Sequence, residues 1–340
     1  MKTRTLTLWF KISAFAFVLG TSADLLNAAD KAPANNTWTD PAVAATEEPS
    51  FAVQGEYGVA EKGQAWALQV VALGEGKLDG YLLEGGFPGL GYTRDKKKIK
   101  LSGALGDAVG SATLAGPDGR AVKISDGQAV VTQGDKLIGK LPRVERESPT
   151  LGKKAPEGAL VLFDGSAESA AANWNKGEAV DGLLRNNDIS TKRKFGDYHL
   201  HLEFRTPYKP YARGQGRGNS GVYHQHRYET QVLDAFGLEG MDNETGGIYK
   251  VAAPKVNMCL PPLTWQTYDV DFEAAKFDAE GKQVEPAYLT VRLNGFLIHD
   301  RQAVPGSTGG GKPVTPEPGP IFLQGHGNPV FYRNVWVVEK

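Results

Sequence analysis

The residues best suited to chemistry lie in segment 214–234, where a glycine-rich stretch leads into two short runs of strand length. Glu229 and Gln231 share one face of the second run, and Asp234 falls on the opposite face unless a β-bulge turns it. Carboxylates and an amide clustered here suit sugar chemistry, which needs acceptors for hydroxyl groups and a proton carrier near the ring. The glycine-rich stretch itself is not a phosphate loop, because neither Gly-Lys-Ser/Thr nor a helix follows it.

Four histidines form two His-x-His pairs, His199/His201 and His224/His226, and each pair shares a face if it lies on a strand. Together with a carboxylate such as Glu229, they are candidate ligands for a divalent metal ion. The alternative is that they are hydrogen-bonding histidines along a groove. The single cysteine, Cys259, excludes a disulfide framework and is expected to be a small buried hydrophobic residue.

Strands must position these side chains. Residues 198–205 alternate strictly between apolar and polar, which predicts a half-buried strand whose polar face carries His199, His201, Glu203 and Arg205. Residues 267–273 repeat the pattern, and 288–293 and 296–299 flank an Asn-Gly pair typical of a tight hairpin. With further strands at 320–323 and 330–338 and no long amphipathic helix, the sequence predicts a two-sheet antiparallel sandwich.

The preceding residues divide into three parts. Positive charges, an apolar run at 12–20 and small residues thereafter indicate a signal peptide over 1–29, cleaved near Ala28 or Ala29. The protein is therefore expected in the bacterial periplasm or outside the cell, without stable membrane insertion. Residues 30–50 have the composition of a linker, and 51–148 predict a small β-rich domain, with the boundary in the Pro- and Gly-punctuated stretch 143–156.

The charge balance argues against a nucleic-acid partner. Lys and Arg number 38 and Asp and Glu number 39, which gives a net charge of -1. A nucleic-acid-binding domain usually carries a basic field, whereas this balance suits a neutral sugar.

Seven motifs in this order resemble the 3-keto-disaccharide hydrolase domain family over residues 155–340. They lie at 162–165, 195–205, 217–223, 228–234, 261–269, 291–295 and 318–327. The upstream β region resembles an extension found before this domain in secreted planctomycete-type proteins. The resemblance implies an all-β protein whose C-terminal part is a concanavalin-like jelly roll with a concave polar sheet, preceded by a smaller β-rich domain.

The family resemblance also implies an activity, cleavage of glycosides already oxidised to a ketone at sugar carbon 3. Such a ketone acidifies the hydrogen on carbon 2, so a modest base can remove it and the substituent on carbon 1 can leave, with or without rehydration. On this basis Glu229, His201 or His224 is the base, and Arg205, Lys250 or a bound metal stabilises the enolate. The remaining candidates bind substrate hydroxyls or that metal: Glu203, Asn219, Tyr223, Gln231, Asp234 and His326.

Two other functions stay open at this level. A sandwich of this kind also serves as a non-catalytic carbohydrate-binding module, with aromatic residues such as Trp174 or Tyr223 in its groove. An ordinary retaining glycosidase would instead use Glu229 and Asp234 as a carboxylate pair about 5–5.5 Å apart.

Overall fold

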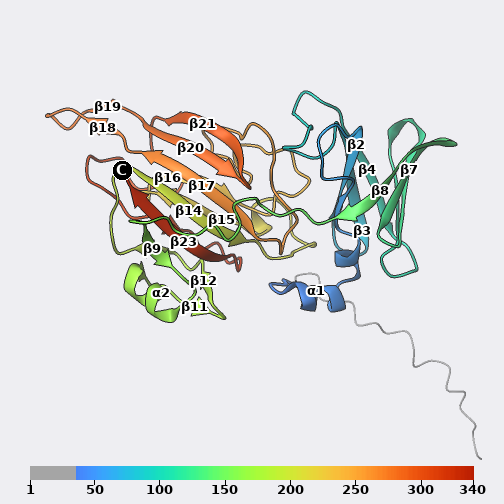
Figure 1. The fold of residues 1–340 in the computed structure, drawn as a ribbon, viewed down its shortest axis with the longest axis horizontal. Coiled ribbons are helices and arrows are strands. Elements are labelled where there is room, and N and C mark those ends of the chain that lie inside the picture. Colours follow the sequence, from blue (N-terminus) through green and yellow to red (C-terminus); the bar gives the residue numbers. More distant parts are fainter. Residues whose placement is uncertain (1–35) are drawn as a thin grey trace, which may run out of the picture. The chain divides into compact units, whose positions relative to one another are not determined.

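The structure is a computed structural model that describes residues 36–340, so the expected signal peptide lies outside the described residues. The described residues form one compact unit. No helix in the described part is long and apolar enough to cross a membrane. The fold is all-β, as the sequence predicts, with a closed barrel followed by a two-sheet sandwich (Figure 1).

Part of the segment expected as a linker is folded. Asp40 caps the helix α1 (Pro41–Glu47) by accepting from the amides of Ala42 and Val43, and the 3-10 helix η1 (Pro49–Ala52) follows. Trp38 is buried and pairs through its backbone with Tyr208 of the sandwich. The low-periodicity composition of this segment gave no sign of that contact, because it joins backbone groups of residues that lie far apart in the chain.

The closed barrel consists of eight antiparallel strands in chain order. They are β1 (Gly55–Tyr57), β2 (Trp66–Ala72), β3 (Lys77–Glu84), β4 (Lys98–Leu105), β5 (Ala112–Ala115), β6 (Arg120–Ser125), β7 (Gln128–Gln133) and β8 (Lys136–Val144), with the short η2 (Pro117–Gly119) before β6. Asp126 and Gly127 both have positive φ and form the two-residue turn between β6 and β7, as the Asp-Gly pair predicts.

The sandwich pairs a five-stranded sheet, in the order β10-β13-β22-β15-β16, with an eight-stranded one. The first contains β10 (Trp174–Asn175), β13 (Ile189–Thr191), β15 (Ser220–His224), β16 (Tyr228–Val232) and β22 (Phe322–Leu323). The second contains β9 (Leu160–Phe163), β11 (Ala179–Val180), β12 (Leu183–Arg185), β14 (Tyr198–Arg205), β17 (Gln266–Glu273), β20 (Ala287–Leu293), β21 (Phe296–Val304) and β23 (Phe331–Glu339). Smaller elements are α2 (Ala167–Asn173), η3 (Gly214–Gly216) and the pair β18 (Lys276–Phe277) and β19 (Gln283–Glu285).

The hydrophobic core lies between these two sheets. Tyr198, Leu200, Leu202 and Phe204 of β14 are fully buried in it, which leaves the other side chains of β14 on the outer face. Because side chains alternate along a strand, β15 and β16 likewise direct their even-numbered residues inward and their odd-numbered residues outward. Each sheet therefore has a polar outer face.

The barrel contacts the loop that follows β16. Lys98 of β4 donates to the carbonyl oxygens of Gly237 and Leu238 and pairs with Glu239 at 2.7 Å. From the other side, Arg217 donates to the carbonyl oxygen of Ala72 in β2 at 3.1 Å. The division of the chain into domains at 51–148 and 155–340 stays a prediction.

Candidate active site

The outer face of β15 and β16 forms the floor of a pocket of about 510 Å³. Glu229 and Gln231 of β16 and Tyr223 of β15 lie on this floor. The walls come from loops before β15, after β16, before β22 and after β22. The lining residues are Gln215, Asn219, Tyr223, Glu229, Gln231, Tyr249, Gly309, Gly310, Gln324 and His326. Five of the predicted site residues, Asn219, Tyr223, Glu229, Gln231 and His326, thus share one pocket.

The side chain of Glu229 reaches across the neighbouring strand β15 and occupies the space that a side chain at position 221 would fill. A Cβ atom on Gly221 would lie 2.3 Å from Glu229 Oε1 and 3.0 Å from the Tyr223 ring. The Tyr223 hydroxyl lies 2.9 Å from Glu229 Oε2, and the backbone amide of Glu229 donates to Thr308 Oγ1 at 2.9 Å. The strand pair and the 308–311 loop therefore fix the carboxyl group in one place.

The carboxyl group of Glu229 is buried without a cation beside it. Its side chain is 2% exposed, and the pocket lining contains neither Lys nor Arg. Burial raises the pKa of Glu229 to about 8, and the hydrogen bond from Tyr223 only partly opposes this. Ionisation is costly in such surroundings, so the group takes up or releases a proton near neutral pH.

Tyr223 links Glu229 to the pocket wall. Its hydroxyl oxygen accepts from Gln324 Nε2 at 3.1 Å and also lies 2.7 Å from the carbonyl oxygen of Gly309. Burial and the neighbouring carboxyl group raise the pKa of Tyr223 well above its ordinary value. In the resting pocket the phenol is therefore protonated and acts as a hydrogen-bond donor.

Two amides complete the polar lining. Gln231 donates from Nε2 to Gln215 Oε1 at 3.0 Å, which joins the floor to the 3-10 helix η3. Asn219 is 6% exposed, and its Oδ1 atom is buried without a hydrogen-bond partner among the described residues. A buried acceptor without a partner is costly, and a hydroxyl of a bound sugar would satisfy it.

The polar face of β14 forms a different cluster, on the other sheet. His201 Nδ1 lies 2.9 Å from Asp269, and Glu203 accepts from Arg333 Nε at 2.7 Å and from the amide of Gly152 at 2.6 Å. Segment 148–153 covers this face, with Lys153 bonded to Asp269 at 3.1 Å. The cluster borders a pocket of about 380 Å³, but its carboxylates are already paired. Of the predicted base and hydroxyl-binding residues, His201 and Glu203 thus lie away from Glu229.

Three other predicted site residues do not line the pocket of Glu229. Arg205 donates to the carbonyl oxygen of Thr39 at 2.9 Å on the outer face of the larger sheet. Lys250 is exposed beside Asp242, and Asp234 is buried in an ion pair with Arg217 at 2.6 Å. Asp234 lies two residues beyond the end of β16, so the chain after the strand, and not the strand's alternation, decides where its carboxylate points.

The two His-x-His pairs do not form one site. His224 is fully buried in the core, where it bonds Tyr198 and Thr230 and stacks on Phe272, and burial lowers its pKa to about 3. His226 lies in the turn after β15, where its positive φ breaks the strand, and it stacks on Phe322. His199 lies on the other sheet beside Asp271. Among the described residues no group of three or more His, Cys, Asp or Glu could hold a metal ion, so the proposed ligand set does not fit one.

The sequence pointed to the pocket's remaining wall only in part. Gln324 directly follows β22, and Tyr249 lies in the long loop between β16 and β17; polar loop residues often line pockets. Gln215 and the carbonyl-bearing loop at Gly309 and Gly310 were missed. The one available signal was the run of three glycines at 309–311, which lets the backbone approach Tyr223: a Cβ on Gly310 would lie 2.9 Å from its hydroxyl.

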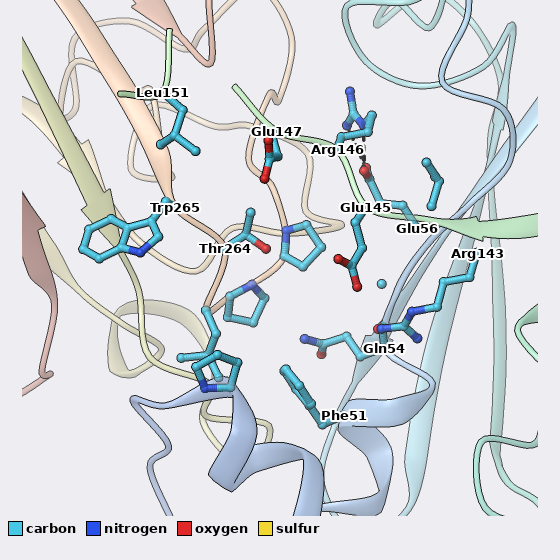
Figure 2. Close-up of a pocket in the computed structure, with 16 residues that line it drawn as sticks. Phe51, Gln54, Glu56, Arg143, Glu145, Arg146, Glu147, Leu151, Thr264 and Trp265 are labelled. Carbon is cyan, nitrogen blue, oxygen red and sulfur yellow. Dashed lines mark hydrogen bonds and ion pairs between the residues drawn. The ribbon is translucent and has the colours of Figure 1, made fainter. Parts of the chain in front are cut away.

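A third pocket, of about 350 Å³, lies between the end of β8 and the loop before β17 (Figure 2). Trp265 lies across it from Glu145. The two arginines that line it are bound to other residues of the barrel region. Arg146 binds the carboxylate of Glu56 at 2.6 Å, and Arg143 donates to the carbonyl oxygen of Gln54 at 2.8 Å. None of the predicted site residues is among the residues that line this pocket.

Comparisons with known proteins agree with this fold. The family model of the 3-keto-alpha-glucoside-1,2-lyase-like domain matches residues 158–338, more than half of the chain. The chain therefore belongs to this family, whose concanavalin-like sandwich is the one described above. No curated protein matches the sequence.

Two solved structures from Parabacteroides distasonis ATCC 8503 are similar to the chain, and both are of candidate glycosyl hydrolases. The first is 35% identical, with a TM-score of 0.50 over 55% of this chain and 85% of that one. The second is 20% identical, with a TM-score of 0.38 over 54% and 94%, and is too distant to bear on function. The family and the first structure together support a glycoside-processing enzyme.

Proposed function

We propose that this protein cleaves 3-keto-glycosides in the pocket of Glu229, by removal of the proton on carbon 2 and elimination of the carbon 1 substituent, with or without rehydration. The observation that carries the proposal is a lone, buried carboxyl group facing a pocket of neutral hydrogen-bonding side chains. This is what removal of an activated C–H proton requires: one base of suitable strength, and donors for the oxygen that becomes negative.

The surroundings of Glu229 suit it to be that base. A carboxylate with a pKa of about 8 takes a proton from carbon more readily than an ordinary glutamate, while part of it is still ionised near pH 7. His201 and His224, the other candidate bases, lie on the opposite sheet and in the core. Glu229 is therefore the base that we propose.

Neutral side chains take the binding roles in this mechanism. Asn219 Oδ1 accepts from a sugar hydroxyl, and Gln231, Gln324 and His326 supply further polar contacts around the ring. Arg205 and Lys250 lie elsewhere, so the developing enolate is stabilised by the amide and phenol donors of the pocket.

The pocket lining does not favour an ordinary glycosidase. Both the retaining and the inverting mechanism need two carboxyl groups flanking the bond, whereas Glu229 is the one carboxylic residue among the residues that line this pocket. Asp234, the expected partner, is bound to Arg217. A binding module has no use for a base with a raised pKa, so the carboxyl group also favours catalysis over binding alone.

The test compares wild type and Glu229→Gln on a glucoside and its 3-keto derivative, each with and without a chelator. We expect wild type to cleave only the 3-keto substrate, regardless of chelator, and the variant to lose about 1,000-fold or more in kcat. Equal thermal unfolding of the two proteins is the folding control. Retained activity of the variant, or cleavage of the unoxidised glucoside alone, would overturn the proposal.

A further inference from the structure

We propose that Tyr223 is the acid that protonates the departing glycosidic oxygen, and that Glu229 restores its proton with the one taken from carbon 2. This inference rests on the proposed function. It adds the identity of the group that completes the elimination, and so the kind of aglycone that the pocket can release.

The elimination needs an acid because of its leaving group. When the bond between carbon 1 and oxygen breaks, both electrons stay on the oxygen. An alcohol or a second sugar would leave as a strongly basic alkoxide, which is slow unless a proton arrives as the bond breaks. Neither Lys nor Arg is among the residues that line the pocket, so the proton must come from another side chain there.

Few lining residues can supply it. Besides Glu229, the side chains that can give up a proton are Tyr223, Tyr249 and His326. Of these three, Tyr223 is the one whose hydroxyl contacts the Glu229 carboxyl group, at 2.9 Å. It is therefore the donor that Glu229 can reprotonate directly once the carbon 2 proton has reached the carboxylate.

The hydrogen bonds of Tyr223 show how the proton can move. The hydroxyl has one hydrogen and two oxygen neighbours, Glu229 Oε2 at 2.9 Å and the carbonyl oxygen of Gly309 at 2.7 Å, while Gln324 donates to it. One hydrogen cannot serve both acceptors. With Glu229 ionised, Tyr223 donates to it; with Glu229 protonated, the carboxyl group donates to Tyr223, which turns its own hydrogen toward Gly309.

The second arrangement is the one that follows proton abstraction. The hydrogen of Tyr223 then points away from Glu229, toward an acceptor oxygen in the pocket. A glycosidic oxygen bound next to the Gly309 carbonyl, within hydrogen-bond distance of the phenol, would receive it. Gln324, which donates to the phenol oxygen at 3.1 Å, stabilises the negative charge that develops there.

The step balances without any further reactant. The C2–H electrons form the C1=C2 double bond, conjugated with the carbon 3 ketone, and the C1–O electrons leave with the aglycone oxygen. That oxygen takes the Tyr223 proton, and Tyr223 takes the proton that Glu229 received from carbon 2. The products are an unsaturated 3-keto sugar and a neutral alcohol, with both residues back in their starting states.

The test is Tyr223→Phe with two 3-keto-glucosides, one with an alkyl aglycone and one with 4-nitrophenyl. Nitrophenolate leaves without help, so the variant should lose about 100-fold in kcat on the alkyl substrate and less than about fivefold on the nitrophenyl one. Tyr249→Phe, which removes a hydroxyl from the same pocket, should change both rates by the same factor. A loss shared equally by both substrates in Tyr223→Phe would overturn the proposal and leave Tyr223 a positioning role.

Two further measurements keep the outcome decisive. If Tyr223→Phe does not fold, wild-type kcat across a series of aglycones serves instead: weak dependence on aglycone acidity supports an enzymic acid, and steep dependence contradicts it. Glu229→Gln separates this inference from the function on which it rests. The Glu229→Gln variant should lose activity on both substrates to the same extent, whereas full activity of this variant would refute the proposed function itself.

Discussion

Two glutamates, Glu203 and Glu229, are buried to the same depth on the outer faces of opposite sheets, at 1% and 2% exposure, yet their protonation is opposite. Burial alone would raise the pKa of Glu203, but hydrogen bonds from His201, Asn334, Arg333 and the amide of Gly152 lower it to about 2. Glu229 has a single hydrogen bond from Tyr223 to oppose burial, and its pKa rises to about 8.

The difference shows what separates a structural carboxylate from a chemical one in this fold. Around Glu203 the charges cancel: burial would lower the pKa of His201, but Asp269 and Glu203 raise it overall, and segment 148–153 covers the cluster. The residues that line the pocket of Glu229 include neither Lys nor Arg, so no cation there offsets the cost of burying its charge. The first cluster fastens the connecting segment to the sandwich, and the second can exchange a proton.

The largest expected effect on stability is that of Glu203→Gln. The amide group would direct a donor at Arg333, Asn334 or the Gly152 amide, all of which already donate to Glu203. We expect a loss of about 3 kcal/mol in the free energy of unfolding, measured by urea denaturation, because one partner of a buried charge network is removed. Turnover by the protein that remains folded should be unchanged.

The control lies on the same sheet. Glu273 pairs with Arg301 at 2.8 Å, and both side chains are exposed. Glu273→Gln should cost less than about 1 kcal/mol, as is usual for surface pairs. If the two variants lose equal stability, the Glu203 cluster does not stabilise the attachment of segment 148–153 to the sandwich, as its contacts indicate that it does.

Next in size is a difference in pH dependence. Between pH 4.5 and about 8 folded Glu229 binds more protons than the unfolded chain, so it weakens stability as pH rises. Glu203 does the opposite: the unfolded chain binds more protons between pH 4.5 and about 2, so stability falls as pH falls. A carboxyl group whose pKa differs by one between the folded and unfolded chain changes the free energy of unfolding by about 1.4 kcal/mol.

Urea denaturation of wild type, Glu229→Gln and Glu203→Gln across pH 3 to 9 measures both. The free energy of unfolding of Glu229→Gln should increase relative to that of wild type between pH 5 and 9. The free energy of unfolding that Glu203→Gln lacks relative to wild type should become smaller toward pH 3. In the same range, kcat/KM of wild type should rise with pH up to about 8, as the base ionises. Parallel stability curves for all three proteins would contradict the comparison.

The sequence predicts the strands well because local patterns determine them. The alternation at 198–205 matches β14 residue for residue, and the Asn294-Gly295 pair has the positive φ angles of the expected turn. Alternation shows that His201 and Glu229 each lie on one face of a strand. It does not show what covers that face, because the Lys153 and Gly152 contacts join residues far apart in the chain. The pocket of Glu229 was therefore predictable, but its separation from the β14 cluster was not.

Gly221→Ala tests how strictly Glu229 is positioned. The new Cβ would lie 2.3 Å from Glu229 Oε1, so the carboxyl group must shift. A displacement of about 1 Å can reduce kcat about 100-fold, and we expect a loss of that order with a modest decrease in melting temperature. Gly216→Ala is the matched control, since nothing lies within 4 Å of a Cβ there. An active Gly221→Ala variant would mean that the carboxyl position is not critical.

The smallest expected effect is that of Lys250→Gln. The residue follows Tyr249, which lines the pocket, but its own ammonium group is exposed and lies 3.7 Å from Asp242. A cation that stabilised the enolate would be worth about 100- to 1,000-fold in kcat, whereas a surface charge outside the pocket should change kcat/KM less than about twofold and stability by less than about 0.5 kcal/mol. A large decrease in kcat/KM, measured by steady-state kinetics, would show that the Lys250 ammonium group acts in the pocket. The contrast between the balanced charges around Glu203 and the unbalanced charge of Glu229 would then no longer hold.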